Sequence, residues 1–141
     1  MSYVLYYNPD SANLVIRMVL EEMALPYEDR MVSRIRTDRN DDFFRLNPRG
    51  LLPVLIDEQQ DVALFETAAI LLYLADKHRQ LAPGMTDGRA RGTFLKWLFM
   101  LSNTLHADLR FRFYSERFVT SEGKTAPLLL ATKNVCIVIS N

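Results

Sequence analysis

The N-terminal part of the chain alternates between two hydrophobic patterns. Short apolar runs that end at turn residues predict β-strands at 3–7, 27–32, 51–57 and 62–65. Apolar residues at helical spacing predict helices at 12–24, 41–46 and 67–78. Strands and helices that follow one another in this order predict an α/β domain with a mixed sheet.

The pattern changes after the breaker sequence Leu81-Ala82-Pro83-Gly84. From Asp87 to about Tyr114 a long helical pattern continues without strand-like runs. We therefore expect an α/β domain at 1–81 and part of an all-α domain at 86–141. The arginine-rich segment 33–40 has few apolar side chains and predicts a solvated loop.

Composition narrows the classes of partner. The 141 residues are 49% hydrophobic and 24% charged, a balance that allows a buried core. Basic and acidic residues both number 17, so net charge favours neither nucleic acid nor a membrane surface as partner. One cysteine, Cys136, excludes a disulfide framework, a CxxC pair and a cysteine-rich metal site. With no signal-like N-terminus, the expected location is cytoplasmic, and no metal is expected.

The pair Leu52-Pro53 opens the third predicted strand. Proline cannot donate a ladder hydrogen bond, so the neighbouring backbone keeps pairing capacity. If the bond between them is cis, the N–H and C=O of Leu52 can face outward and pair with a short peptide such as glutathione. The alternative is a strand-edge proline without a ligand, and the dipeptide alone favours it.

Glu66 and Thr67 lie where a strand ends and an apolar helix begins. Free N–H groups at a helix N-terminus attract a carboxylate, and Glu66 can receive an ammonium group. The pair therefore suits the zwitterionic end of an amino acid. Simple helix capping is the alternative, and it is the stronger interpretation for these two residues alone.

Two hydroxyl groups are candidates for activating a thiol. Ser11 stands at the expected N-cap of the first helix, and Tyr6 lies near the end of the preceding strand. A thiolate beside the helix N-terminus gains from the dipole and from a hydroxyl donor. A capping serine and a core tyrosine are equally good interpretations.

Four segments in this order resemble the cytosolic glutathione S-transferases of bacteria: LYYNPDSANLVIRMVLEE, NPRGLLPVLID, LFETAAILLYLADKH and FLKWLFMLSNTLH. The resemblance implies a thioredoxin-like N-terminal domain, a helical C-terminal domain and a homodimer. It also implies a detoxifying enzyme that binds glutathione along a cis-proline strand and directs its thiolate at an electrophilic small molecule in a cleft between the domains.

The resemblance also assigns binding residues. It implies that Leu52 supplies the backbone pairing, Pro53 the cis bond, and Glu66 with Thr67 the γ-glutamyl site. Residue 51 is a leucine where many members carry a polar residue for the glycyl carboxylate. We therefore expect Arg49 or a residue of the helix predicted at 41–46 to replace it, or the affinity for glutathione to be lower.

Candidate catalytic residues follow in the same way. Tyr6 matches the tyrosine of tyrosine-type members, and Ser11 lies near the serine of serine-type members; we expect Ser11 to be the better candidate. Ala12 stands where some bacterial members have a cysteine, which argues against thiol exchange. His106 matches a histidine that lines the cleft in that subset. After Phe118 the sequence departs from the family.

Two functions remain open. The first is a glutathione transferase that stabilises the thiolate and conjugates it to an electrophile. The second is a transferase-like protein that binds glutathione or regulates a partner without turnover. Pro53, Glu66 and Thr67 favour ligand binding, whereas Ala12 and the atypical tail favour lost activity.

Overall fold

The structure is a computed structural model that describes residues 3–9, 11–33 and 42–114. These residues form two compact units that part between Asp87 and Gly88. The predicted loop at 34–40 and the tail with Cys136 lie outside the described residues. In the first unit the elements are β1 (Tyr3–Tyr7), α1 (Asn13–Glu22), β2 (Tyr27–Met31), α2 (Asp42–Leu46), β3 (Val54–Asp57), β4 (Val62–Phe65) and α3 (Thr67–His78).

The four strands form one mixed sheet in the order β2-β1-β3-β4. β1 runs parallel to β2 and antiparallel to β3, and β3 and β4 form the predicted hairpin. The crossover from β1 to β2 passes through α1, as a parallel pair requires. The predicted thioredoxin-like α/β fold is confirmed, and the strand at Tyr3–Tyr7 and the helix at Thr67–His78 have the bounds that the pattern predicts.

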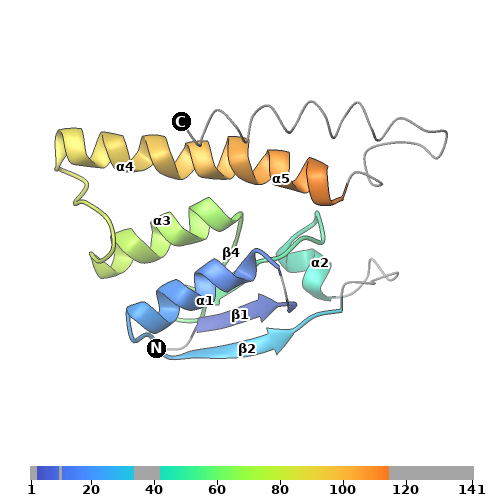
Figure 1. Cartoon of the computed structure of the whole chain (residues 1–141). Helices are drawn as coiled ribbons and strands as arrows, with labels where there is room; N and C mark the ends of the chain where they lie inside the picture. The colour runs from blue at the N-terminus through green and yellow to red at the C-terminus, as the bar shows by residue number, and fades with distance from the viewer. Residues whose placement is uncertain (1–2, 10, 34–41, 115–141) are drawn as a thin grey trace. The chain divides into compact units, whose positions relative to one another are not determined.

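The core of this unit lies between the sheet and the helices α1 and α3, which run side by side (Figure 1). Successive side chains of a strand point to opposite faces of the sheet. Tyr3, Leu5 and Tyr7 belong to this core, whereas Tyr6 packs its ring against Phe43 of α2, with 5.6 Å between ring centroids. Buried residues from α1 and its C-cap, from β3 and from α3 complete it: Ile16, Leu20, Met23, Leu55, Ile70, Leu74 and Ala75.

A buried carboxylate, Asp57, ends β3. Its side chain forms an ion pair with Lys77 and accepts hydrogen bonds from the Tyr73 hydroxyl at 2.7 Å and from the Gln60 N–H at 3.2 Å. Burial raises the pKa of Asp57, but the bonds from Lys77 and Tyr73 outweigh burial, so the pKa lies below 3.8. Burial and the bond to Asp57 raise the pKa of Tyr73 to about 12. α3 is thereby fixed to the end of β3.

The turn that precedes β3 is organised by the buried side chain of Asn47. Its amide donates to the Leu51 carbonyl at 2.8 Å, and its carbonyl accepts from the Arg49 N–H at 3.1 Å. Gly50 has φ +65°, and a Cβ there would lie 2.4 Å from the Phe44 ring. Only glycine meets both conditions without strain, so this residue fixes the path of the chain towards β3.

The second unit consists of α4 (Gly88–Met100), the π-helical segment η1 (Leu101–Leu105) and α5 (His106–Phe113). These segments follow one another without a break, as the predicted long helix requires. None of their residues in the described part is buried, and Trp97, Phe99, Leu101 and Phe113 are exposed.

Candidate functional site

Three connections of the first unit meet at one end of the sheet. Tyr6 of β1 is paired with Val54 of β3, and Val54 is paired with Phe65 of β4. The chain therefore leaves β1, enters β3 and leaves β4 at the same edge. We call this edge the loop end; it comprises residues 8–9, 11–12, 47–53 and 66–67. All but one of the predicted site residues belong to it or to the strand that leads into it.

Leu52 and Pro53 directly precede β3 at the loop end. The peptide bond between them is cis, as the resemblance implies. Pro53 is buried, and Leu52 is half-buried. Among the described residues no hydrogen bond uses the backbone N–H or C=O of Leu52. Within the described part of the chain, the N–H and C=O of Leu52 thus have no hydrogen-bond partner and are available to a peptide ligand.

Glu66 and Thr67 begin α3. Glu66 is the N-cap, with φ 71° and ψ 114°, and it makes no side-chain capping bond to the helix. Its carboxylate instead accepts a hydrogen bond from the Arg49 guanidinium at 3.0 Å, in an ion pair in which both side chains are more than half exposed. The structure therefore brings Arg49 and Glu66 together, and capping by Glu66 is excluded.

Ser11 does not cap α1. The N-cap residue is Ala12, without a side-chain capping bond, and the hydroxyl of Ser11 donates to the side-chain carbonyl of Asn13. The prediction of a capping serine was wrong because the helix begins one residue later than expected, at Asn13 with Ala12 as its N-cap, and the Ser11 side chain contacts the side chain of Asn13. The Ser11 carbonyl does accept a hydrogen bond from the Leu14 N–H at 3.1 Å.

Tyr6 is half-buried and faces the side of the sheet that carries α2, opposite the core that α1 covers. Its hydroxyl accepts a hydrogen bond from Arg30 at 3.2 Å, and the Arg30 guanidinium lies 5.8 Å from the centre of its ring. Arg30 is the residue of β2 paired with Tyr6. The sequence pattern did not predict the contact between Tyr6 and Arg30, because the register of two parallel strands depends on the connection between them.

His106 is the first residue of α5 in the second unit, so its role in a cleft stays a prediction. The described residues contain no group of His, Cys, Asp and Glu side chains suited to a metal ion. They also contain no helix with the length and apolar composition that a membrane span needs.

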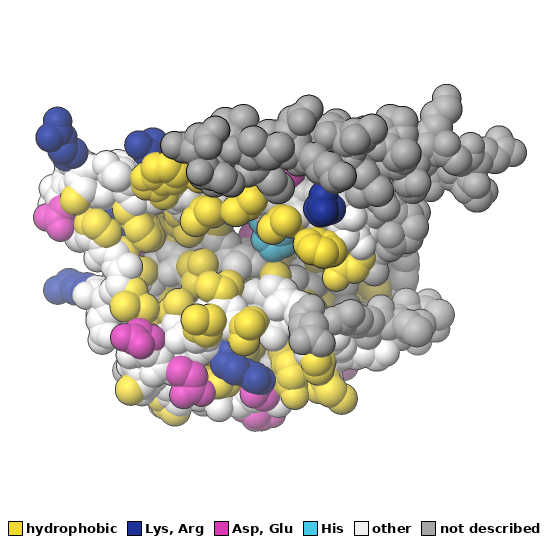
Figure 2. All heavy atoms as spheres, viewed as in Figure 1, with side chains coloured by type: hydrophobic (Ala, Val, Ile, Leu, Met, Phe, Trp, Pro, Cys, Tyr) yellow, Lys and Arg dark blue, Asp and Glu magenta, His cyan; other side chains and the backbone are white. Residues whose placement is uncertain are grey.

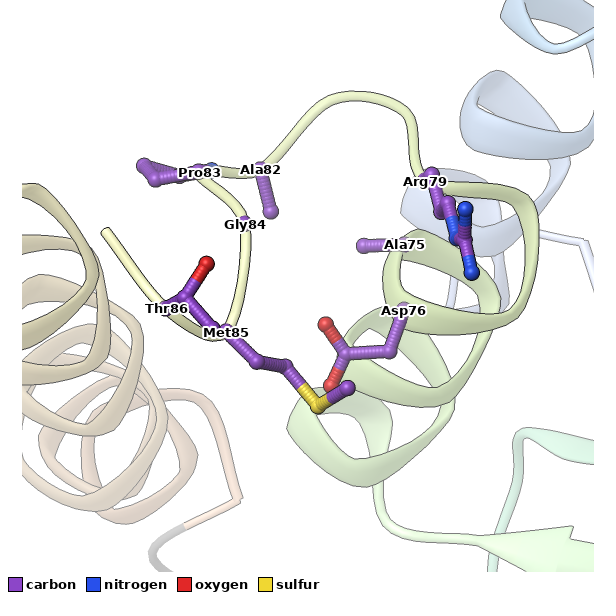
Figure 3. Close-up of a pocket in the computed structure, with 8 residues that line it drawn as sticks. All are labelled: Ala75, Asp76, Arg79, Ala82, Pro83, Gly84, Met85 and Thr86. Atoms are coloured by element: carbon purple, nitrogen blue, oxygen red, sulfur yellow. The ribbon is translucent and has the colours of Figure 1, made fainter.

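A cavity of about 340 Å³ lies away from the loop end, beside the last turn of α3 (Figure 3). Ala75, Asp76 and Arg79 line one side of it, and residues 82–86 line the other. Because α3 has 12 residues, at about 1.5 Å each, its two ends are about 18 Å apart. The cavity is therefore distinct from the predicted site.

Hydrophobic side chains also gather at the surface over α1 (Figure 2). Leu14 and Met18 are 59% and 61% exposed, with Val15 between them. This surface begins two residues after Ala12 in the sequence.

Comparison with known families and proteins agrees with this geometry. Residues 14–77 match the family model described as the glutathione S-transferase N-terminal domain. Glutathione S-transferase GstB of Escherichia coli K12 is 34% identical over 91 residues, which cover 64% of this chain and 44% of GstB. Glutathione S-transferase GST-4.5 of Xanthomonas campestris is 32% identical over 121 residues, 84% of this chain and 57% of the relative. The chain thus spans about half the length of these curated relatives.

Solved structures extend the match beyond the N-terminal unit. A glutathione transferase family member from Pseudomonas fluorescens, solved with two glutathione molecules bound, is 28% identical, with a TM-score of 0.75 over 94% of this chain and 60% of that one. A glutathione transferase homologue from Sulfitobacter, solved with bound glutathione, has a TM-score of 0.81 at 24% identity, over 99% of this chain and 67% of that one. The second match supports the fold.

Proposed function

This chain belongs to the glutathione S-transferase family, and we propose that it binds glutathione at the loop end and transfers the glutathione thiolate to an electrophilic small molecule. The observation that carries the proposal is the meeting of three features at one edge of the sheet: the unpaired Leu52 backbone, the start of α3 with Glu66, and the start of α1 with Ser11.

Each end of glutathione has a counterpart in this arrangement. We propose that the cysteinyl backbone pairs with the N–H and C=O of Leu52, in the manner of an added strand. The γ-glutamyl carboxylate binds the backbone N–H and the hydroxyl of Thr67, and the γ-glutamyl ammonium binds Glu66. The glycyl carboxylate binds Arg49, and Pro53 holds the turn.

The ion pair between Arg49 and Glu66 supports this assignment. An exposed pair contributes about 0 to 1 kcal/mol, so little is lost when each partner turns to a ligand of opposite charge. The two charged ends of an extended tripeptide lie farther apart than the 3.0 Å between Arg49 and Glu66, so the pair opens and each side chain turns to its own end of the ligand. A zwitterionic peptide supplies both complementary charges.

In the catalytic step Ser11 donates its hydroxyl proton to the sulfur of glutathione in a hydrogen bond, which favours the thiolate over the thiol. Tyr6 is the second candidate for this role. We further propose a cytoplasmic homodimeric detoxification enzyme, with 1–81 as the glutathione-binding domain and 86–141 as part of the helical domain. In that domain His106 lines the electrophile cleft. Neither a metal nor a nucleic acid or membrane partner enters this proposal.

Calorimetric titration with glutathione tests the binding site. The double variant Glu66→Ala with Thr67→Ala should bind about 10- to 100-fold more weakly, because a hydrogen bond to a charged group contributes about 1.5 to 3 kcal/mol. Thr86→Ala, in the cavity at the other end of α3, is the matched control and should leave the affinity unchanged. Unchanged binding by the double variant, or weaker binding by Thr86→Ala, places glutathione elsewhere.

A second function, glutathione binding without turnover, is favoured by one observation: the hydroxyl of Ser11, the first candidate for stabilising the thiolate, already donates its proton to Asn13. A chlorodinitrobenzene assay separates the two functions. For the transferase, Ser11→Ala should lower turnover by about 10- to 100-fold, with little change in glutathione affinity. Tyr6→Phe and Cys136→Ala should remain active. A wild-type protein that binds glutathione and shows no turnover supports the second function.

A further inference from the structure

Asn13, the first residue of α1, has two hydrogen bonds to one atom. Its side-chain carbonyl oxygen accepts from the backbone N–H of Asn8 at 3.2 Å and from the hydroxyl of Ser11. The residue is 5% exposed. The sequence alone gives no signal for Asn13, because an asparagine in the first turn of a helix is ordinary.

These two bonds define the direction of the Ser11 proton. A backbone N–H can only donate, so the oxygen of the Asn13 amide, and not its nitrogen, must face Asn8. The Ser11 hydroxyl lies against that same oxygen and must donate to it. Since a serine hydroxyl carries one proton, the group that Ser11 offers to any other neighbour in this arrangement is an acceptor.

We propose that Asn13 is the positioning residue of Ser11, because its side-chain carbonyl competes with the glutathione sulfur for the hydroxyl proton of Ser11. This inference rests on the proposed function. A thiolate is a charged acceptor and forms a stronger hydrogen bond than a neutral amide oxygen does, so it draws the hydroxyl away from Asn13. Asn13 then keeps the Asn8 N–H, and its buried oxygen stays paired.

The proton balance is simple. The proton of the glutathione thiol leaves to water, and the hydroxyl proton of Ser11 stays on its oxygen and only changes the acceptor to which it points. The strength of the acceptor at position 13 therefore sets how far Ser11 favours the thiolate. A stronger acceptor holds the hydroxyl and raises the pKa of bound glutathione, and removal of the acceptor lowers it.

Three variants at two positions test this role. Asn13→Asp keeps the size of the side chain and the acceptor for Asn8 but carries a charge, and Asn13→Ala removes the acceptor. Each Asn13 variant is prepared in the wild-type protein and in Ser11→Ala. The pKa of the thiol of bound glutathione is then measured from the ultraviolet absorbance of the thiolate. The Ser11→Ala background is the matched control, because it keeps every effect of charge and loses the hydroxyl.

We expect Asn13→Asp to raise the pKa of the glutathione thiol in both backgrounds, because it adds a negative charge. The increase should be about one unit larger in the protein that keeps Ser11 than in Ser11→Ala, which corresponds to a further tenfold loss of thiolate at a fixed pH. Asn13→Ala should lower the thiol pKa only where Ser11 is present. If one of the two variants does not fold, as judged by circular dichroism, the other still gives a prediction of defined sign.

The outcomes separate this inference from the function on which it rests. Equal shifts in the two backgrounds, with glutathione binding intact, overturn the role of Asn13 and leave the proposed function standing. An unchanged thiol pKa in Ser11→Ala itself overturns the role of Ser11, and that of Asn13 with it. A wild-type protein that shows no glutathione binding by calorimetry overturns the proposed function.

Discussion

The two ends of the sheet are built by opposite means. At the end of β3 opposite the loop end, the side chains of Tyr3, Asp57, Tyr73, Lys77 and His78 contact one another through hydrogen bonds and an ion pair, and we call them the Asp57 cluster. Asp57 is 1% exposed there. At the loop end, the ion pair of Arg49 with Glu66 is more than half exposed, and the Leu52 backbone has no partner among the described residues.

The difference shows how one helix serves two purposes. The C-terminal half of α3 is fixed to β3 by buried polar contacts, which position the whole helix. The N-terminus of α3, by contrast, carries the exposed ion pair of its N-cap Glu66 with Arg49. We expect changes in the Asp57 cluster to alter stability, and changes at the loop end to alter binding.

Loss of the carboxylate in the Asp57 cluster should have the largest effect. Asp57→Ala leaves the Lys77 ammonium without its buried partner and removes the acceptor of Tyr73. Breaking a buried pair in this way costs about 3 to 5 kcal/mol of unfolding free energy, measured by urea denaturation. Glu58→Ala, on the exposed neighbouring residue, is the control and should change stability little. A loss below 1 kcal/mol in Asp57→Ala would show that the cluster does not hold α3.

Gly50→Ala should be the most harmful backbone change at the loop end. The new Cβ would lie 2.4 Å from the Phe44 ring, at a residue with φ +65°. We expect a loss of about 2 to 3 kcal/mol, since both overpacking and a left-handed backbone are costly. Gly92→Ala in α4 is the control, because it has open space and should gain about 0.5 to 1 kcal/mol. Equal thermal melting of the wild type and Gly50→Ala would contradict the contact with Phe44.

Glu66→Gly should separate stability from binding. Glu66 has φ 71° without being glycine, and such a conformation costs on the order of 1 kcal/mol or more. Glycine relieves that strain and removes the proposed ammonium ligand. We expect about 1 kcal/mol of added stability together with weaker glutathione binding. Glu66→Ala is the matched control, since it removes the carboxylate proposed to bind the ammonium group and keeps the strained backbone conformation. A variant that is both less stable and equally tight in binding would contradict both assignments.

The sequence predicted the elements of the first unit well and the contacts of its site unevenly. The strand at Tyr3–Tyr7 and the helix at Thr67–His78 are strong local patterns that end at turn residues, so the chain itself marks their bounds. The cis bond before Pro53 followed from the resemblance. Contacts between distant residues were not predictable, because they depend on register: Arg30 reaches Tyr6 only through the parallel pairing of β1 and β2.

Side-chain contacts were not predictable from the sequence pattern even between residues close in the chain, as Ser11 shows. Its position before an apolar helix is typical of a cap, but the N-cap of α1 is the next residue, Ala12, and the Ser11 hydroxyl donates to the side chain of Asn13. Residue type and spacing do not define which of two adjacent residues becomes the N-cap, because the start of a helix depends on the backbone conformation at each position. The role of each site residue therefore remains a proposal for mutagenesis, whereas their meeting at the loop end follows from strand register.

The smallest expected effect is a pH dependence that originates in the Asp57 cluster. The Tyr3 hydroxyl and His78 Nε2 lie 2.7 Å apart. Burial and the nearby charge of Lys77 lower the pKa of His78 from 6.5. A histidine with a lowered pKa in the folded state binds its proton more readily when unfolded, so its contribution to stability is present above pH 6.5 and is lost as the pH falls through the folded pKa. We therefore expect a shallow decrease in unfolding free energy below neutrality.

Asp57 also makes the unfolding free energy decrease as the pH falls, but over a lower pH range than His78. Its folded pKa lies below 3.8, so its contribution is complete above that pH and is lost only in stronger acid. Urea denaturation between pH 7 and pH 5 therefore reports on His78 without titrating Asp57. His78→Gln keeps a side-chain acceptor for Tyr3 and has no charge to gain, so it should remove most of the slope in that interval. A slope that persists unchanged in His78→Gln assigns it to other groups, and a stability that rises towards pH 5 in the wild type would contradict the direction of the His78 pKa shift.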